Sequence, residues 1–332
     1  MQSIASKIHQ KIFNKDKFNF EEVALELFVF QYTYNSVYKQ FVDYLKINVN
    51  KIQTVQQIPF LPIELFKTHN IIVDNVSTQK IFESSGTTGQ LTSKHLVADL
   101  NLYTQSFETC FTKFYGNIDE YTILALLPSY LERNTSSLVY MVDDLIKKSN
   151  NKNSGFYLNN LDELSINLKS QISNTRSKIL LIGVTFALLD FAEQFPMDLS
   201  NVIIMETGGM KGRREEMTRE EVHAILTKAF NIESIHSEYG MTELLSQGYS
   251  KGNGIFEVPY WTKILKRDIY DPFNISTNMG RGGLNVIDLA NIYSCAFIAT
   301  QDLVNIKNET EFEVLGRIDN ADIRGCNLMV AM

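Results

Sequence analysis

The sequence predicts an α/β protein with three parts: a helical N-terminal segment, a core on a parallel or mixed sheet, and a small β-rich subdomain at the end. Apolar residues recur at helical spacing near the N-terminus. From about residue 71, short β-branched or apolar runs alternate with helical segments, as in βαβ units. After about residue 250, the chain is rich in Gly, Asn and short strand-like pieces. The expected domains are residues 1–70, 71–250 and 251–332.

The first expected element is a long amphipathic helix over residues 20–46. Its apolar residues follow one another at spacings of three and four: Val23, Leu27, Phe30, Tyr34, Val37, Phe41 and Leu45. This spacing gives a helix one apolar face. A helix packed on the core explains the pattern, and a short coiled-coil seam for a partner is the alternative. Pro59 and Pro62 then mark a loop into the next unit.

The expected core consists of buried strands separated by helices. Three runs are apolar at consecutive positions, as in strands covered on both faces: 121–127, 178–184 and 202–206. Helices are expected between them, at 134–149, 160–173 and 215–230. The acidic pair Glu215 and Glu216 favours a helix N-terminus at the last of these. Further strands are expected at 284–289 and 293–300.

Composition excludes several classes of protein. The net charge of −7 argues against a nucleic-acid binder, and 44% hydrophobic residues fit an ordinary globular chain. The three cysteines are widely spaced without a CxxC pair, so neither a disulfide framework nor a zinc site is expected, and a cytoplasmic location fits best. The longest apolar stretch, Ile179 to Leu189, is shorter than the roughly 20 residues of a membrane span. The N-terminus has no secretory-signal pattern.

A hydroxyl- and glycine-rich loop is the first candidate site. It follows a strand-like run and contains Ser84, Ser85, Gly86, Thr87, Thr88, Gly89 and, further on, Lys94. Glycines let the backbone approach an anion, and clustered N–H groups, hydroxyls and a lysine suit the phosphates of ATP. The loop is not a Walker loop, because it lacks GxxxxGK[ST]. A Ser/Thr-rich turn without a ligand is the alternative.

Two further candidate segments follow strand-like runs. Gly208, Gly209 and Met210 form a turn after a buried strand, where open α/β sheets bind ligands, although an ordinary strand-to-helix turn is the alternative. The second segment contains Tyr239, Gly240, Thr242 and Glu243. Tyr239 offers a ring for stacking, and Glu243 offers a carboxylate for Mg²⁺ beside phosphates. A surface turn with a helix-start glutamate is the alternative, and His236 is expected to be structural.

The fourth candidate segment lies at the end of the chain. Asp302 can bind a ribose hydroxyl pair, and Arg317 can reach an anionic ligand. Cys326 follows a glycine six residues before the end of the chain, where a thiol is accessible as a nucleophile, and Arg324 favours its thiolate. A free cysteine acting as a small buried hydrophobe is the alternative.

In this order, the motifs SSGTTG, TGG, YGMTE, QD and GRxDN resemble the adenylate-forming superfamily of acyl- and aryl-CoA ligases, luciferases and peptide-synthetase adenylation domains. Within it, the chain is most similar to the acyl-protein synthetase family of bacterial bioluminescence, the LuxE type, which is related to phenylacetate-CoA ligases. The similar stretches are IPFLPIELFKTH, ETGGMKG, EYGMTEL and GRIDNADIRGCNLMV. They extend over nearly the whole chain.

The resemblance implies that a carboxylic acid, expected to be a fatty acid, reacts with Mg·ATP to give an acyl adenylate, whose acyl group then passes to a cysteine. It assigns the β/γ-phosphates to Ser84–Gly89 and Lys94, the adenine side to Gly208, Gly209, Met210, Tyr239 and Gly240, and a phosphate contact to Thr242. Glu243 is implied as the Mg²⁺ ligand, Asp302 as the ribose contact, Arg317 as the arginine after the hinge glycine, and Cys326 as the acyl acceptor. An acyl-CoA-reductase-type enzyme is the implied partner, and an oligomer is compatible with the sequence.

The chain also departs from the superfamily pattern. Gln301 stands where a glycine usually precedes the aspartate, and Asn320 replaces a second aspartate. The superfamily's C-terminal domain carries an adenylation lysine, and this chain stops at Met332, just after the hinge-like segment, so we expect a fold without that domain. Two alternatives stay open: an acyl- or aryl-CoA ligase, and a non-catalytic nucleotide-binding partner subunit.

Overall fold

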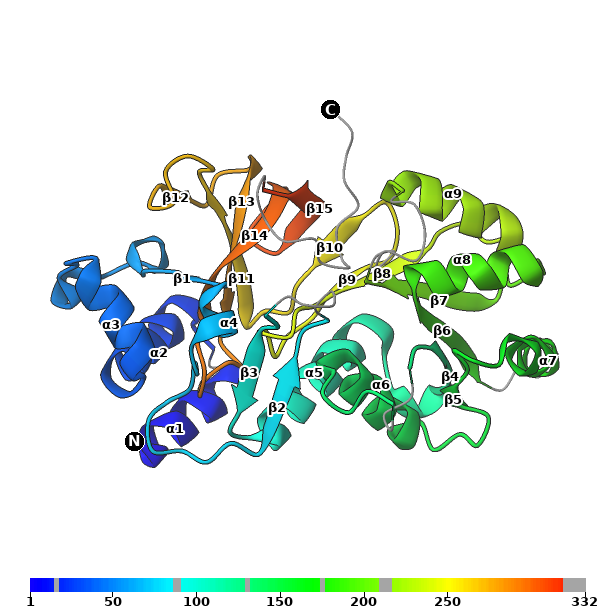
Figure 1. Cartoon of the computed structure of the whole chain (residues 1–332), viewed down its shortest axis with the longest axis horizontal. Coiled ribbons are helices and arrows are strands. Elements are labelled where there is room, and N and C mark those ends of the chain that lie inside the picture. The colour runs from blue at the N-terminus through cyan, green and yellow to red at the C-terminus, as the bar shows by residue number, and fades with distance from the viewer. Residues whose placement is uncertain (15–17, 86–90, 129–131, 174–176, 209–216, 319–332) are drawn as a thin grey trace. The chain divides into compact units, whose positions relative to one another are not determined.

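A computed structural model describes the chain except for residues 15–17, 86–90, 129–131, 174–176, 209–216 and 319–332. The described residues form two compact units (Figure 1). The first unit contains Met1–Phe107, Met241–Gln247 and residues 258–318, and the second contains Glu108–Gly240 and Gly248–Glu257. The predicted α/β class is confirmed, with antiparallel strands concentrated in the first unit and parallel strands in the second.

The first unit begins with helices. They are α1 (Gln2–Ile12), α2 (Phe20–Tyr34), α3 (Ser36–Tyr44), the short α4 (Leu65–Thr68) and the first half of α5 (Leu100–Tyr115), with 3-10 turns at Val49–Lys51 and Val55–Gln57. The prediction of one helix over 20–46 is wrong, because the helix breaks at Asn35. Asn35 has an extended backbone, its side chain accepts a hydrogen bond from Tyr38 N at 3.0 Å, and its Nδ2 donates to Ser294 O at 3.0 Å. A buried cap therefore ends α2 and starts α3.

An antiparallel sheet forms the other half of the first unit. Its strand order is β12 (Ile275–Ser276), β11 (Thr262–Arg267), β13 (Gly280–Asp288), β14 (Phe297–Ile306) and β15 (Glu311–Arg317). The short strand β1 (Leu61–Pro62) adds to β14 in parallel, and β2 (Lys80–Glu83) and β3 (Lys94–Val97) form a separate hairpin. The predicted strand at 284–289 belongs to β13. The strand expected at 293–300 instead begins at Phe297, because turns occupy the residues after Asp288.

The second unit contains a largely parallel sheet. Its order is β10 (Ile255–Glu257), β9 (Gly248–Ser250), β8 (His236–Tyr239), β7 (Val202–Thr207), β6 (Lys178–Val184), β4 (Tyr121–Leu126) and β5 (Gly155–Phe156). Neighbouring strands from β8 to β5 are parallel. Strand β9 is antiparallel to β8, and β10 is antiparallel to β9. The three apolar runs of the sequence are confirmed as β4, β6 and β7 at the centre. All of β4 is buried, as expected for a strand covered on both faces.

Helices flank this parallel sheet. They are α6 (Ser137–Lys148), α7 (Leu161–Ile172), α8 (Thr185–Gln194) and α9 (Arg219–Phe230), together with the second half of α5. Helices α8 and α9 pack side by side, and α8 also contacts β6 and β7 (Figure 1). The helix expected at 215–230 begins later, at Arg219, because Thr218 and Glu221 form a capping box. Glu215 and Glu216 lie outside the described residues.

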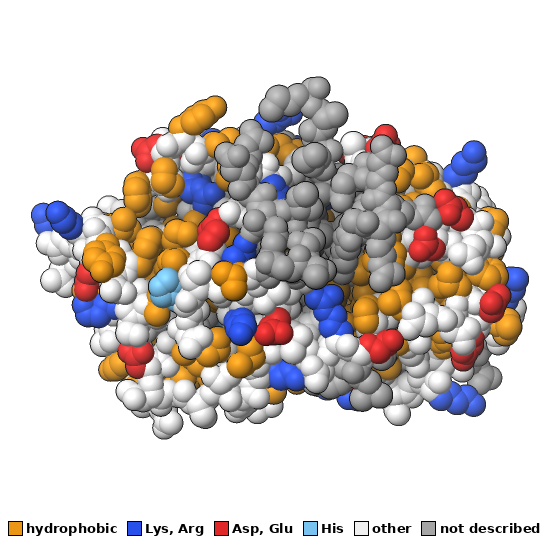
Figure 2. All heavy atoms as spheres, in the orientation of Figure 1, with side chains coloured by type: hydrophobic (Ala, Val, Ile, Leu, Met, Phe, Trp, Pro, Cys, Tyr) orange, Lys and Arg blue, Asp and Glu red, His pale blue; other side chains and the backbone are white. Residues whose placement is uncertain are grey.

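The surface of the first unit exposes apolar side chains near α3 and β12. Figure 2 shows them gathered over this part of the molecule. Tyr44, Ile269 and Phe273 are among the exposed large hydrophobic residues of the unit. None of the described helices combines the length and apolarity that crossing a membrane requires.

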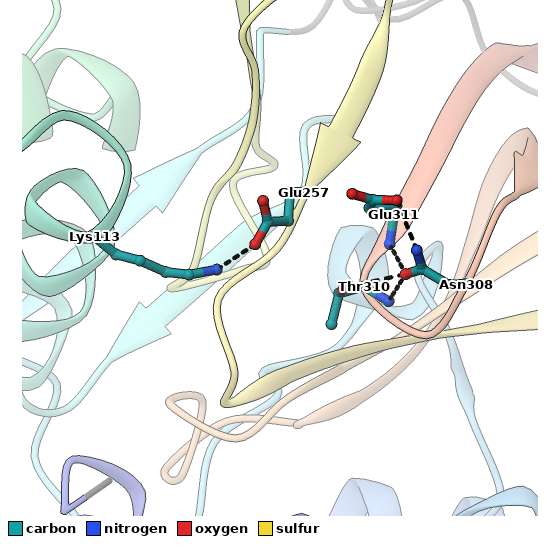
Figure 3. A network of polar contacts seen from close by, with 5 residues as sticks. All are labelled: Lys113, Glu257, Asn308, Thr310 and Glu311. Carbon is teal, nitrogen blue, oxygen red and sulfur yellow. Dashed lines mark hydrogen bonds and ion pairs between the residues drawn. The ribbon is translucent and has the colours of Figure 1, made fainter.

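Polar contacts fix two connections, one in each unit (Figure 3). In the second unit, Lys113 on α5 forms an ion pair with Glu257 on β10 at 2.6 Å. In the first unit, Asn308 closes the turn between β14 and β15: its Oδ1 accepts hydrogen bonds from the N–H groups of Thr310 and Glu311, each at 2.9 Å. Both contacts are exposed, so their main contribution is to local geometry.

Candidate active site

The loop containing Thr242 and Glu243 is held inside the first unit by side chains from two other segments. His95 on β3 donates from Nδ1 to the carbonyl of Thr242 at 2.8 Å. Asn291 donates from Nδ2 to the carbonyl of Glu243 at 2.8 Å, and its Oδ1 lies 3.2 Å from His95 Nε2. Burial lowers the pKa of His95. The backbone at the predicted magnesium ligand is therefore fixed by a buried network.

Asp288 holds the next two residues of the same loop. Its Oδ2 accepts hydrogen bonds from Leu245 N at 2.8 Å and Ser246 N at 3.0 Å. Its Oδ1 accepts from the Ser246 hydroxyl at 2.6 Å and from Ala290 N at 3.2 Å. Burial raises the pKa of Asp288, and these four donors oppose that effect. Loop 241–247 is thus tied to the end of β13 through one carboxylate.

The hydroxyl- and glycine-rich loop joins β2 to β3 in the first unit. Ser84 N donates to Ser93 O at 3.1 Å, and Ser93 N donates to the Ser84 hydroxyl at 2.9 Å, which closes the base of the loop. Ser85 is exposed. The Lys94 side chain is 53% exposed and lies 4.0 Å from Glu83, a loose surface pair that leaves its ammonium accessible. Gly86, Thr87, Thr88 and Gly89 lie outside the described residues.

His95 links these two parts of the first unit. It follows Lys94 on β3 and contacts Thr242 in loop 241–247. The structure therefore brings the base of the predicted phosphate loop next to the segment with the predicted magnesium ligand. Glu243 itself is fully buried.

Asp302 and Arg317 occupy facing positions on neighbouring strands. They are register partners on β14 and β15, and Asp302 is buried. Arg317 donates to the side-chain oxygen of Gln301, whose amide nitrogen in turn donates to Glu64. Ile318 N also donates to Gln301 O at 2.9 Å. Gln301, which stands where the superfamily that the sequence resembles has a glycine, thus holds both Arg317 and Ile318.

The second unit contains the predicted adenine-side residues. Thr207 on β7 faces Glu238 on β8, so Gly208 and Tyr239 follow at the same edge of the parallel sheet. Gly208 has a φ of +76°, a conformation that favours glycine. The Tyr239 ring is buried and packs on Phe256 with centroids 5.7 Å apart. Gly240 follows at the end of β8, and Gly209 and Met210 lie outside the described residues.

Two acidic residues that were not candidates in the sequence lie at the same edge. Glu206 accepts from the Thr185 hydroxyl at 3.0 Å, and Glu238 accepts from the Thr207 hydroxyl at 2.6 Å. Burial, together with the charge of Glu206, raises the pKa of Glu238 to about 7. Burial also opposes ionisation of Glu206, but His223 and Arg219 outweigh it and lower the pKa of Glu206.

His236 sits away from that edge, at the start of β8. Its Nδ1 lies 3.1 Å from the Tyr115 hydroxyl, and burial lowers the pKa of His236 to about 4. It is therefore neutral near pH 7 and contacts a buried tyrosine.

Sequence reasoning did not identify the residues that fix loop 241–247, namely His95, Asp288 and Asn291. Their partners are far away in the sequence: His95 and Thr242 are 147 positions apart, and Asp288 and Leu245 are 43 apart. Asp288 gave one usable signal, because it is an acidic residue within the apolar run Leu284 to Leu289.

The donor set fits magnesium when ATP supplies the remaining ligands. The described residues contain no group of three or more His, Cys, Asp or Glu side chains that could hold a metal ion. Mg²⁺ in nucleotide sites commonly takes one or two carboxylates, substrate phosphates and waters, so a single carboxylate such as that of Glu243 matches this donor chemistry.

The chain has the fold of adenylate-forming ligases. It is similar to 2-hydroxyisobutyryl-CoA ligase in complex with 2-HIB-AMP and CoA in an open conformation, at 10% identity and a TM-score of 0.62, covering 94% of this chain and 77% of that one. The same ligase in its postadenylation state gives 12% identity, a TM-score of 0.63, and coverage of 94% and 70%. O-succinylbenzoate coenzyme A synthetase from Bacillus subtilis, in complex with ATP and magnesium, is 15% identical with a TM-score of 0.50, and the match covers 74% of this chain and 51% of that one.

Comparison by sequence finds no match. No protein-family model matches the chain, and no curated protein matches it.

Proposed function

We propose that this chain is an ATP-dependent acyl-adenylate-forming ligase that loads the acyl group onto its own Cys326. The supporting observation is the fixed loop 241–247: His95, on the strand that follows the predicted phosphate loop, donates to the carbonyl of Thr242, the residue before the predicted magnesium ligand Glu243. The fold supports the same proposal, because it is shared with ligases that form acyl adenylates.

The first step is adenylation. A carboxylate oxygen of the acid attacks the α-phosphorus of ATP, and the bond to the leaving pyrophosphate breaks. The exposed ammonium of Lys94 and the hydroxyl of Thr242 are assigned to the phosphates. Glu243 would hold Mg²⁺, which neutralises the charge of the departing pyrophosphate. Asp302 is assigned to the ribose, and Gly208, Tyr239 and Gly240 to the adenine side.

The second step is transfer to a thiolate. The sulfur attacks the acyl carbonyl carbon, the bond to the phosphate oxygen breaks, and AMP leaves. A thiolate is the effective nucleophile near neutral pH. Cys110 and Cys295 are poor acceptors because both are fully buried, and burial raises the pKa of Cys295 to about 12. Cys326, which lies outside the described residues, is the remaining cysteine of the chain.

The finer assignment is a LuxE-type acyl-protein synthetase acting on a fatty acid in the cytoplasm. It rests on the resemblance of the terminal stretch GRIDNADIRGCNLMV and of EYGMTEL. In this proposal the acyl group passes from Cys326 to a partner of the acyl-CoA-reductase type. An acyl-CoA ligase is the competing function, and the solved structures with this fold include CoA ligases.

Intact-protein mass spectrometry tests the acceptor. The chain is incubated with Mg·ATP and a panel of carboxylic acids, and any hydroxylamine-labile adduct is mapped to a peptide. We expect an ATP-dependent adduct on Cys326, none on Cys110 or Cys295, and none on Cys326→Ser, which still releases pyrophosphate. Cys110→Ala is the matched control and keeps the adduct. Normal self-acylation of Cys326→Ser contradicts the acceptor role, and release of acyl-CoA when CoA is added favours the ligase alternative.

A further inference from the structure

The first unit contains a cavity of about 740 Å³ that the proposed reaction does not use. This volume is within the range of small-molecule sites. Its walls come from α3 and the segment after it, the connection between β11 and β12, and β14. Most of the wall is aliphatic or aromatic, including Phe41, Ile52, Ile58, Phe60, Ile275 and Ile318.

This cavity does not include the predicted nucleotide contacts Asp302 and Arg317. On β14, Ala299, Thr300 and Gln301 line it, and Gln301 also accepts a hydrogen bond from Arg317. Successive side chains of a strand point to opposite faces, so those of Ala299 and Gln301 point away from the face that holds Asp302.

One wall of the cavity contains a buried cation, Arg267, which is only 8% exposed. Its Nη1 donates to Asn285 Oδ1 at 2.9 Å and its Nη2 donates to Thr300 O at 2.7 Å. The guanidinium lies where a side chain of Gly283 would be, since a Cβ there would come within 3.0 Å of Nη2. The structure thus places and orients this arginine.

Both acceptors of Arg267 are uncharged. Within the described part of the chain, no carboxylate forms an ion pair with it; Glu64 acts on it only through longer-range attraction. Buried charges are normally paired, because an uncompensated buried charge strongly destabilises the folded state. The charged residues of the wall are Lys51, Arg267 and Glu64, two cations and one anion. The cavity therefore favours an anion.

We propose that this cavity is a second ligand site, for an amphipathic carboxylate whose head pairs with Arg267 and whose apolar body lies along Ile58, Phe60 and Ile275. A carboxylate matches the planar guanidinium, and one anionic head on an apolar body matches a wall with a single excess positive charge. The site is independent of the proposed acyl transfer, since it needs neither ATP nor Cys326.

Calorimetric titration without nucleotide tests the site, with dodecanoate below its micelle-forming concentration and dodecanol as the uncharged analogue. We expect saturable binding of dodecanoate to this cavity. Arg267→Gln is expected to weaken the binding of dodecanoate about tenfold or more, because one charge-assisted contact is lost, and to change the binding of dodecanol far less. Arg281→Gln removes the same charge from an exposed position outside the cavity and leaves both ligands unchanged.

Ala299→Leu provides the second variant, because it fills the cavity without removing a charge. It is expected to weaken the binding of both ligands about tenfold or more. If a thermal unfolding control shows that Arg267→Gln does not fold, Ala299→Leu alone tests whether the cavity binds the ligand. Saturable dodecanoate binding that Ala299→Leu leaves unchanged would place the ligand elsewhere and overturn the proposal. Absence of saturable binding to the unmodified chain would also overturn it, and neither result bears on self-acylation of Cys326.

Discussion

Replacing Asp288 by Ala tests how loop 241–247 is held. The substitution removes the acceptor of three buried backbone donors, Leu245 N, Ser246 N and Ala290 N, and of the Ser246 hydroxyl. A buried donor without an acceptor costs about 1–3 kcal/mol, so the three backbone groups together give a loss of about 3–9 kcal/mol in the free energy of unfolding. Asp288→Asn keeps one acceptor oxygen and is expected to lose about half as much.

The chain provides its own probe for this change. Its single tryptophan, Trp261, is fully buried in the first unit and donates from Nε1 to the Ser246 hydroxyl at 2.9 Å. Urea unfolding followed by Trp261 emission therefore reports on the unit that contains Asp288. In the native state, the emission maximum of Asp288→Ala is expected to shift, because the Ser246 hydroxyl loses its hydrogen bond to Asp288 Oδ1.

Asp74→Ala is the matched control. Asp74 is an exposed aspartate of the same unit, and its replacement is expected to change the free energy of unfolding by less than about 0.5 kcal/mol. If Asp288→Ala gives the same unfolding curve and the same Trp261 emission as Asp74→Ala, the carboxylate does not hold the loop and the reasoning is refuted.

Three further predictions concern the fold. Glu238 has a pKa of about 7 in the folded chain, above its ordinary value, so as the pH rises the unfolded chain releases this proton first. The stability of the unmodified chain relative to Glu238→Gln is therefore expected to fall between about pH 5 and pH 8. Thermal unfolding of both proteins at these two pH values measures the difference in stability, and a difference that stays constant would contradict the prediction. Gly183→Ala places a Cβ 2.8 Å from Leu126 Cβ in the buried sheet and is expected to cost about 1–3 kcal/mol in urea unfolding, whereas an unchanged midpoint would show that the strands adjust. Asn35→Ala removes the buried cap between α2 and α3 and is expected to cost about 1–2 kcal/mol in urea unfolding, and equal stability would argue against the cap. Asn35→Asp keeps the cap acceptor but turns a carboxylate oxygen toward the carbonyl of Ser294, so it is expected to be no milder.

The sequence was sufficient to predict the centre of the second unit. Strands β4, β6 and β7 are apolar at consecutive positions, and that local property alone indicates burial on both faces. The break at Asn35 was not predictable in this way, because apolar spacing continues across it and the hydrogen bond to Ser294 comes from 259 positions away. The start of α9 was within reach, since Thr218 and Glu221 have the spacing of a capping box.

The candidate site shows the same division. Loop positions such as Ser84 and Glu243 were selected from local chemistry, glycines and hydroxyls for phosphate and a carboxylate for magnesium. The residues that fix them, His95 and Asn291, act through tertiary contacts between segments 147 and 48 positions apart, which no local pattern contains. Arg267 was missed for a similar reason, since its burial follows from the packing of β11 against the glycines of β13.

Transfer of ¹⁸O from a labelled carboxylic acid to AMP is the most direct test of the central claim. In the proposed sequence, the carboxylate oxygen that attacks the α-phosphorus stays with the phosphate when the thiolate of Cys326 takes the acyl group. Each turnover of the doubly labelled acid is therefore expected to give one AMP carrying one ¹⁸O, together with pyrophosphate. Unlabelled AMP, or label in inorganic phosphate, would contradict an acyl-adenylate intermediate.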